Sequence, residues 1–350
     1  MLTSAMLRRV GQPLCAVLLF AASTLAAHAE DELRITAKAA ILLDADTGQV
    51  LYAREPHLPL PPASTTKVLT ALIALERLNP NAMLPVSPSA AEAPPSRVGL
   101  RPGDRISAND ALYGLLLKSG NDTAEVVAES IGGSVPGFAR LMNARARQLG
   151  ALDSHFANPH GLPNDEHQST AYDLAVIFRY AMLNPQFERI VQTQNQILQV
   201  ERASAQGRAQ PVMVATHNRL LGTYDGAMGG KTGYTVKAKR CYVGETERGN
   251  HRLIVAVLGS SALWEDSRKL FDYGFARYGL ATPPQAAPIP VRVTAPARAV
   301  KASTRSAVAP RKASAPSAAK STKPAPRAKT VAPKKPAPRP ESRVASRGRG

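Results

Sequence analysis

The C-terminal segment limits the possible fold more than any other part of the sequence. Residues 291–350 carry 16 Lys and Arg against one acid, Glu341, and contain no Leu, Ile, Met or aromatic residue. A segment with so little apolar surface cannot offset the entropy lost on ordering. We therefore expect residues 283–350 to form a disordered, basic, Pro/Ala/Lys/Arg-rich tail. Residues 291–350 hold +15 of the net charge of +18, so the other 290 residues are nearly neutral.

The first 29 residues are typical of a cleaved secretory signal peptide. Arg8 and Arg9 precede the apolar stretch Leu14–Leu25, and Ala27–Ala29 matches an A-x-A cleavage site. The apolar stretch is short for a membrane-spanning anchor. The sequence thus predicts export to the periplasm or cell envelope. Cys241 is the only cysteine after the signal, so the mature chain is expected to form no internal disulfide.

Residues 30–282 combine strand-like segments at both ends with helix-like segments in the middle. The strand-like segments lie at 39–55, around the turn 46–48, and at 231–235, 240–247 and 252–260. The helix-like segments begin at Ser64 and cover 107–133, 137–151 and 169–184, with a closing helix at 265–279. This order predicts an α/β fold, mixed α and β, with one antiparallel sheet flanked by helices and an inserted all-helical lobe.

Three short polar motifs lie in different parts of this domain. They are Ser64-x-x-Lys67 at the start of an apolar helix, Ser119-Gly120-Asn121 in a turn, and Lys231-Thr232-Gly233 on a strand. Taken alone, the first is explained by a helix-capping serine followed by a surface lysine, and the other two by ordinary turn and strand residues. Their order and their positions on helix, turn and strand match the S-x-x-K, S-x-N and K-T-G set of penicillin-interacting enzymes.

The spacing of Ser64 and Lys67 suits nucleophilic catalysis. Residues at i and i+3 lie on one face of a helix, within reach of each other. A serine hydroxyl needs a neighbouring base to become a nucleophile. Lys67 can act as that base only if its pKa is depressed, either by burial or by a second cation, for which Lys231 is the candidate.

With these motifs, and with the segments DADTGQVLY and NPHGL....HQSTAYDLA, residues 33–280 resemble the D-alanyl-D-alanine carboxypeptidase family of low-molecular-mass penicillin-binding proteins. The resemblance implies a β-lactamase/transpeptidase-like fold and an exported serine peptidase. Such an enzyme releases the terminal D-Ala from peptidoglycan pentapeptides through an acyl-enzyme on Ser64. Its partners would be peptidoglycan stem peptides, with β-lactams as covalent inhibitors, and no cofactor is needed.

The resemblance also assigns roles to individual residues. Ser119 relays a proton to the leaving amine, and Asn121 orients Lys67 and the substrate amide. Lys231 and Thr232 hold a substrate carboxylate, next to Gly233. The backbone N–H groups of Ser64 and Tyr234 form the oxyanion hole. Better-known members carry an arginine in the loop before the last helix, but here that loop reads GSSALWED. This departure leaves open a D,D-endopeptidase that cleaves cross-links.

Two further alternatives are a class A β-lactamase and a non-enzymatic polyanion-binding protein. A class A β-lactamase should carry a Glu-x-x-x-Asn segment after the S-x-N motif, where this chain has NPHGLPNDEHQ. The basic tail is also compatible with a non-enzymatic polyanion-binding protein. We expect no nucleic-acid partner, because an exported chain rarely meets DNA. The tail would instead bind anionic envelope polymers or lipids, peripherally to membrane or wall, or remain a solvated linker.

His155, His160 and His167 lack a metal-ligand pattern, so no metal is expected, and His160 is interpreted as a structural loop residue near the site.

Overall fold

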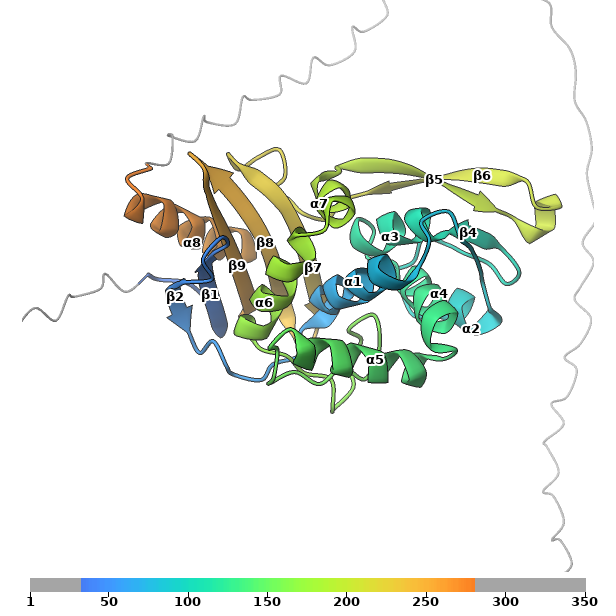
Figure 1. Ribbon diagram of the computed structural model, residues 1–350, viewed down its shortest axis with the longest axis horizontal. Helices are drawn as coiled ribbons and strands as arrows, with labels where there is room; N and C mark the ends of the chain where they lie inside the picture. Colours follow the sequence, from blue (N-terminus) through green and yellow to red (C-terminus); the bar gives the residue numbers. More distant parts are fainter. Residues whose placement is uncertain (1–32, 281–350) are drawn as a thin grey trace, which may run out of the picture. The chain divides into compact units, whose positions relative to one another are not determined.

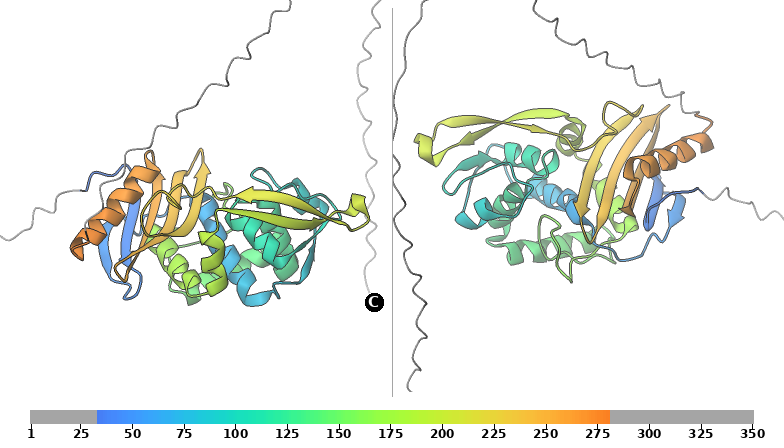
Figure 2. Two further views of the ribbon diagram at one scale, coloured as in Figure 1. Left: turned by 90° about the horizontal axis from the view of Figure 1, so that it is seen from above. Right: turned by 180° about the vertical axis from the view of Figure 1, so that it is seen from behind.

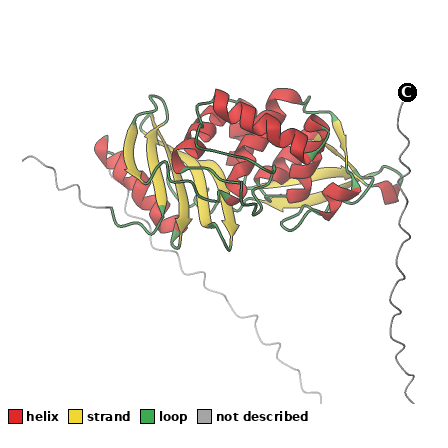
Figure 3. Cartoon of the chain, turned by 90° about the horizontal axis from the view of Figure 1, so that it is seen from below, coloured by secondary structure: helices red, strands yellow, loops and turns green. Residues whose placement is uncertain are grey.

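Two antiparallel sheets with a group of helices between them make up residues 33–280, the part of the chain that the computed structural model describes (Figures 1 and 3). The expected signal peptide, residues 1–29, and the expected basic tail, residues 283–350, lie outside the described residues. Within residues 33–280, no helix is both long enough and apolar enough to span a membrane.

The larger sheet joins strands from the two ends of the domain, as the sequence predicted. Its order is β2-β1-β9-β8-β7, with every neighbouring pair antiparallel. The strands are β1 (Ala39–Asp44), β2 (Val50–Arg54), β7 (Ala227–Thr235), β8 (Lys239–Arg248) and β9 (His251–Ser260). The strand β7 is an edge strand, so the K-T-G motif lies at the border of the sheet.

Both faces of this sheet are buried. Successive strand side chains point to opposite faces, and β1 is apolar at five consecutive positions, Ala39–Leu43, all of them buried. Ile41 and Leu43 join the core that includes α1 and α6 (Ala171–Met182). Leu42 joins a second core that includes α8 (Leu263–Arg277). The sheet is thereby held between helices on both sides.

A single apolar helix lies at the centre of the helical group. This helix, α1 (Lys67–Arg77), contacts α3, α4, α5, α6 and α7. The other helices are α2 (Pro88–Glu92), α3 (Ala108–Leu116), α4 (Asn121–Gly132), α5 (Val135–Gln148) and α7 (Pro185–Gln192). Two helices begin at capping side chains: the Asp110 amide donates to Ser107 Oγ, and the Asp173 amide donates to Thr170 Oγ1, both at 3.0 Å.

The expectation of an all-helical lobe is wrong, because the lobe also contains a four-stranded sheet of order β3-β4-β5-β6. Its strands are β3 (Met83–Pro85), β4 (Arg105–Ser107), β5 (Asn195–Glu201) and β6 (Ala209–Ala215). Strands of three residues are too short to show a periodic pattern. The longer pair, β5 and β6, forms a ribbon that runs beside the helices (Figure 2). One face of the ribbon joins the core through Leu198, Val200 and Val214, but its exposed face also carries apolar side chains, Ile197 and Met213, which obscure the alternation.

Candidate active site

Ser64 lies in a short 3₁₀ helix, η1 (Ala63–Thr66), directly before α1. Pro61 and Pro62 precede it, and proline favours the start of a helical segment over its interior. The sequence placed Ser64 in the first turn of the α-helix itself, whereas α1 begins at Lys67. This turn packs closely on β7, because a Cβ added to Gly233 would lie 2.8 Å from the Ser64 amide nitrogen. Glycine in the K-T-G motif therefore lets the strand approach the serine.

Lys67 is fully buried and directs its amine at Ser64. Its Nζ donates to Ser64 Oγ at 3.0 Å, to Asn121 Oδ1 at 2.7 Å and to the His160 carbonyl oxygen at 2.8 Å. These acceptors match the three donors of an ammonium group. Burial lowers the pKa of Lys67 well below its usual value, and the nearby charge of Lys231 lowers it further. A buried amine with a depressed pKa can accept a proton from the serine.

Lys231, the second buried lysine, approaches from the other side of the cleft. Its Nζ donates to Ser119 Oγ at 3.1 Å and to the Thr232 carbonyl oxygen at 2.8 Å. Burial lowers the pKa of Lys231 to about 7. The structure thus places the two lysines at the two serines, Lys67 at Ser64 and Lys231 at Ser119.

The turn between α3 and α4 positions Ser119 and Asn121. Ser119 has a φ of 61°, a conformation that costs free energy for a residue other than glycine. The Asn121 amide is oriented by two bonds, since its Nδ2 donates to the Pro94 carbonyl oxygen at 2.7 Å and its Oδ1 accepts from Lys67. The following residue, Asp122, is buried, and its carboxylate accepts the amides of residues 98–100. These bonds hold the segment that borders the cleft on this side.

The loop of residues 152–169 closes the site beneath Lys67. The His160 carbonyl oxygen accepts from Lys67 and from Ser64 Oγ, and the His160 imidazole lies 3.4 Å from Glu125 Oε1. Burial lowers the pKa of His160 and lowers that of His167 to about 3. The structure places His160 beside the site, as expected. Within residues 33–280 no cluster of three His, Cys, Asp or Glu side chains is arranged to hold a metal.

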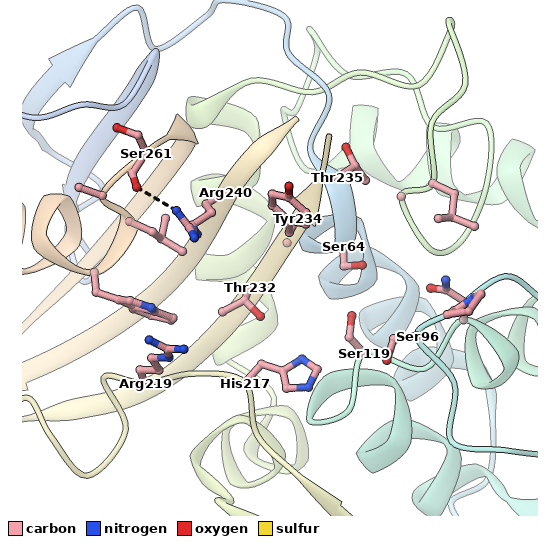
Figure 4. A pocket seen from close by; sticks show the side chains of 18 of the residues that line it. Ser64, Ser96, Ser119, His217, Arg219, Thr232, Tyr234, Thr235, Arg240 and Ser261 are labelled. Carbon is pink, nitrogen blue, oxygen red and sulfur yellow. Dashed lines mark hydrogen bonds between the residues drawn. The ribbon is translucent and has the colours of Figure 1, made fainter. Parts of the chain in front are cut away.

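A cleft of about 610 Å³ opens over Ser64 (Figure 4). Of the eight predicted site residues, six line it, whereas Lys67 and Lys231 lie buried behind it; the six are Ser64, Ser119, Asn121, Thr232, Gly233 and Tyr234. Sequence reasoning did not identify the other residues that line the cleft, among them His217, Arg219, Arg240 and Trp264. Arg240 could have been identified from its position in the sequence. It lies a few residues after the K-T-G motif, where a hairpin would place the next strand beside the strand that carries the motif.

Comparison with known proteins gives one consistent result. A family model described as D-alanyl-D-alanine carboxypeptidase matches residues 25–262. A D-alanyl-D-alanine carboxypeptidase of Mycobacterium tuberculosis is 40% identical over 244 residues, which are 67% of this chain and 81% of that protein.

Two solved structures extend the similarity to the fold. A crystal structure of a D-alanyl-D-alanine carboxypeptidase from M. tuberculosis has a TM-score of 0.65 and 37% identity, and covers 72% of this chain and 96% of that one. The crystal structure of a Streptomyces DD-transpeptidase has a TM-score of 0.66 and 31% identity, and covers 69% of this chain and 98% of that one. The predicted α/β class and β-lactamase/transpeptidase-like architecture are confirmed.

Proposed function

Because this chain belongs to the D-alanyl-D-alanine carboxypeptidase family, we propose that it removes the terminal D-Ala from peptidoglycan pentapeptides through an acyl-enzyme on Ser64. The observation that carries the proposal is the contact of 3.0 Å between Ser64 Oγ and the buried amine of Lys67. The reaction is a serine-type hydrolysis of peptidoglycan peptides, and the residue roles below are part of the proposal.

Acylation begins with transfer of the Ser64 hydroxyl proton to neutral Lys67. Ser64 Oγ then attacks the carbonyl carbon of the penultimate D-Ala, and the carbonyl oxygen becomes an oxyanion. The amides of Ser64 and Tyr234 stabilise this oxyanion, because fixed N–H donors interact most strongly with the charge that develops. The close packing of η1 on Gly233 supports this role, since it places the Ser64 amide beside β7.

The tetrahedral intermediate collapses when the C–N bond breaks. The leaving amine needs a proton, which Ser119 delivers while it regains a proton from the protonated Lys67, so that Lys67 becomes neutral again. The bond from Lys231 to Ser119 supports this relay. Asn121 holds Lys67 in position and contacts the substrate amide. Water then attacks the ester carbonyl while neutral Lys67 takes a proton from it. The bond between the acyl carbon and Ser64 Oγ breaks, Lys67 returns the proton to Ser64 Oγ, and the shortened peptide is released.

The test is covalent labelling of the full chain with a fluorescent penicillin, together with D-Ala release from a pentapeptide. Wild type should be labelled once, at Ser64, and should release D-Ala. Ser64→Ala should do neither, whereas the control Ser261→Ala, which removes another hydroxyl of the cleft, should do both. Labelling of Ser64→Ala at the wild-type rate would rule out the proposal. Rapid turnover of the penicillin would instead favour a β-lactamase.

A second activity, cleavage of D,D cross-links, is favoured by the extent of the cleft. The cleft continues beyond Thr232 to Trp264 and Glu265, which leaves room for a leaving group longer than one amino acid. Cross-linked peptide dimers and pentapeptide monomers, incubated separately with the enzyme and analysed by mass, would rank the two activities.

Export and attachment to the envelope are also part of the proposal, and both depend on segments outside the described residues. Residues 1–29 would direct export, and the basic tail would bind anionic lipids or polymers peripherally through many weak contacts of about 1 kcal/mol per cation. A chain that ends at Thr282 should keep its activity on soluble peptides but lose salt-sensitive retention on envelope fragments. Equal retention of both chains at low salt would show a tail that acts only as a solvated linker.

A further inference from the structure

Glu125 is a buried glutamate on α4, the helix that also carries Asn121. The two residues are one turn apart, and residues at i and i+4 share one face of a helix. This helix packs against α1, which begins with Lys67 (Figure 1). Asn121 Oδ1 accepts from Lys67 Nζ at 2.7 Å. Glu125 Oε1 lies 3.4 Å from His160 Nε2. One face of α4 therefore contacts both the amine of Lys67 and the loop of residues 152–169.

The imidazole of His160 directs an N–H group at this glutamate. Burial lowers the pKa of His160, so the ring is neutral near pH 7 and carries one proton. Its Nδ1 accepts from the Leu162 amide at 3.2 Å, which leaves the proton on Nε2, the atom that faces Glu125. A carboxylate next to one ring nitrogen selects the tautomer and fixes the orientation of the ring. Glu125 therefore determines how His160 lies in the loop.

The backbone of His160 supplies an acceptor to the nucleophile and to its base. Its carbonyl oxygen accepts from Lys67 Nζ at 2.8 Å and from Ser64 Oγ at 3.3 Å. Asn158 Oδ1 accepts the amides of His160 and Gly161, at 3.3 and 2.8 Å, and so shapes the turn around this carbonyl. The position of the turn therefore decides whether the carbonyl meets the amine.

Glu125 connects this turn to α4, whereas Asn158 belongs to the loop itself. Lys67 Nζ donates to acceptors on two separate segments, Asn121 Oδ1 on α4 and the His160 carbonyl oxygen on the loop. The contact between Glu125 and the imidazole fixes the spacing of these acceptors. Stability alone gives no reason for a glutamate here, because replacing both partners of a buried polar pair by apolar groups of the same shape is often nearly neutral.

We propose that Glu125 is a positioning residue, which holds the His160 imidazole against α4 and so keeps the His160 carbonyl oxygen at the amine of Lys67. The inference rests on the proposed function and deepens it, because it gives the packing of α4 on the loop a part in acylation. Glu125 is not part of the cleft lining. It therefore acts through His160 and Lys67 and not on the substrate.

The experiment measures acylation of Ser64 in the full chain by a fluorescent penicillin over a range of penicillin concentrations. Each variant then has a maximum rate constant and a half-saturating concentration. Glu125→Met keeps the length of the side chain but removes the acceptor. Its maximum rate constant should fall about 10- to 100-fold, because small displacements of a catalytic group have effects of this size. Its half-saturating concentration should remain that of wild type, because the lining of the cleft is unchanged.

The pH dependence of the rate constant separates positioning from a general loss of packing. Acylation needs the neutral amine of Lys67, whose pKa is lowered by burial and by Lys231, so the rate should rise with pH. A hydrogen bond to a charged amine favours the charged form, so weakening the bond to the His160 carbonyl should move the midpoint of this rise to lower pH. Only Glu125 is replaced among the titratable groups around this amine, which are Lys231 of β7, Asp122 and Glu125 of α4, and His160 and His167 of the loop.

Glu125→Gln restores the acceptor without the charge, because its amide oxygen can accept from His160 Nε2. Its maximum rate constant should lie within a few-fold of wild type. Its midpoint should lie above that of Glu125→Met, which lacks the same charge. The matched control is Glu129→Met, one turn further along α4, where Glu129 lines a separate groove. Its rate constant and midpoint should be those of wild type.

If Glu125→Met does not fold, Glu125→Asp takes its place, because it keeps the carboxylate but withdraws it by one methylene. It should also be acylated more slowly, with an unchanged half-saturating concentration. Three results would each overturn the assignment of Glu125 while the proposed function stands: a wild-type rate in the folded variant, equal slowing in Glu129→Met, or a Glu125→Gln as slow as Glu125→Met. If the wild-type chain is not labelled at Ser64, the proposed function itself fails.

Discussion

Replacing Lys67 by methionine tests the chemistry of the site most directly. Methionine has a similar length but carries no amine, so Ser64 Oγ loses the group that lies 3.0 Å from it. The hydroxyl proton must then pass to water during attack. Loss of a positioned base commonly lowers a rate by 10²–10⁴-fold. This range corresponds to about 2.7–5.5 kcal/mol in the activation barrier.

The fold should survive the same substitution. Lys67 Nζ is donor to Asn121 Oδ1 and to the His160 carbonyl oxygen, which lose one bond each. The Asn121 amide keeps its bond to Pro94, and the His160 carbonyl keeps its bond from Ser64. The cost of the lost bonds, about 1–3 kcal/mol for each acceptor left unsatisfied, is offset because a buried amine no longer has to be desolvated. We therefore expect a change of less than about 2 kcal/mol in the free energy of unfolding.

The assay is the rate of Ser64 acylation by a fluorescent penicillin, followed over time at several pH values, with urea unfolding measured in parallel. In wild type the rate should rise with pH through the depressed pKa of Lys67, because only the neutral amine accepts a proton. This rise should be absent from Lys67→Met. Lys118→Met, which removes a lysine next to Ser119 that is not part of the cleft lining, should stay within a few-fold of wild type. A folded Lys67→Met that is acylated at the wild-type rate would refute the assignment of the base.

Three further substitutions test how the site is held. Gly161→Ala should lower the free energy of unfolding by at least about 2 kcal/mol, because its Cβ would lie 1.8 Å from the Ala63 carbonyl oxygen. The control is Gly150→Ala, because Gly150 has a φ of 86°, close to that of Gly161, but open space around its Cβ position. In urea unfolding this variant should lose only about 1 kcal/mol of unfolding free energy. Equal losses in the two variants would contradict the clash at Gly161. Asp122→Asn should cost about 2 kcal/mol or more in the same assay, since one amide oxygen cannot replace a carboxylate that accepts four backbone amides; an unchanged midpoint would show that these bonds add little. Between pH 7 and 9.5 the unfolded chain keeps the Lys231 proton that the folded state loses at a pKa of about 7, so wild-type stability should rise with pH, by up to about 3 kcal/mol from this group. Lys231→Met should rise less, and parallel curves would argue against the depressed pKa.

The sequence alone determined those features that depend on local order. Ser64 and Lys67 are three residues apart, so any helical conformation brings them together. The two strand-like runs of residues 39–55, on either side of the turn 46–48, predicted the hairpin that β1 and β2 form. The K-T-G motif lies in the strand-like segment 231–235, which is part of β7. Strand-like segments at both ends of the domain predicted the larger sheet.

Only the tertiary structure decided the contacts between distant segments. The His160 carbonyl that accepts from Lys67 is a backbone group, and a backbone oxygen has no signature in the sequence. Arg240 donates to the Ser261 carbonyl oxygen of a loop fixed by Thr36 and Asp266, which are 230 residues apart, and no local pattern records such a bond. The second sheet was missed for a related reason: two of its strands have only three residues, and the other two carry apolar side chains on both the buried and the exposed face, so no clear apolar alternation marks them.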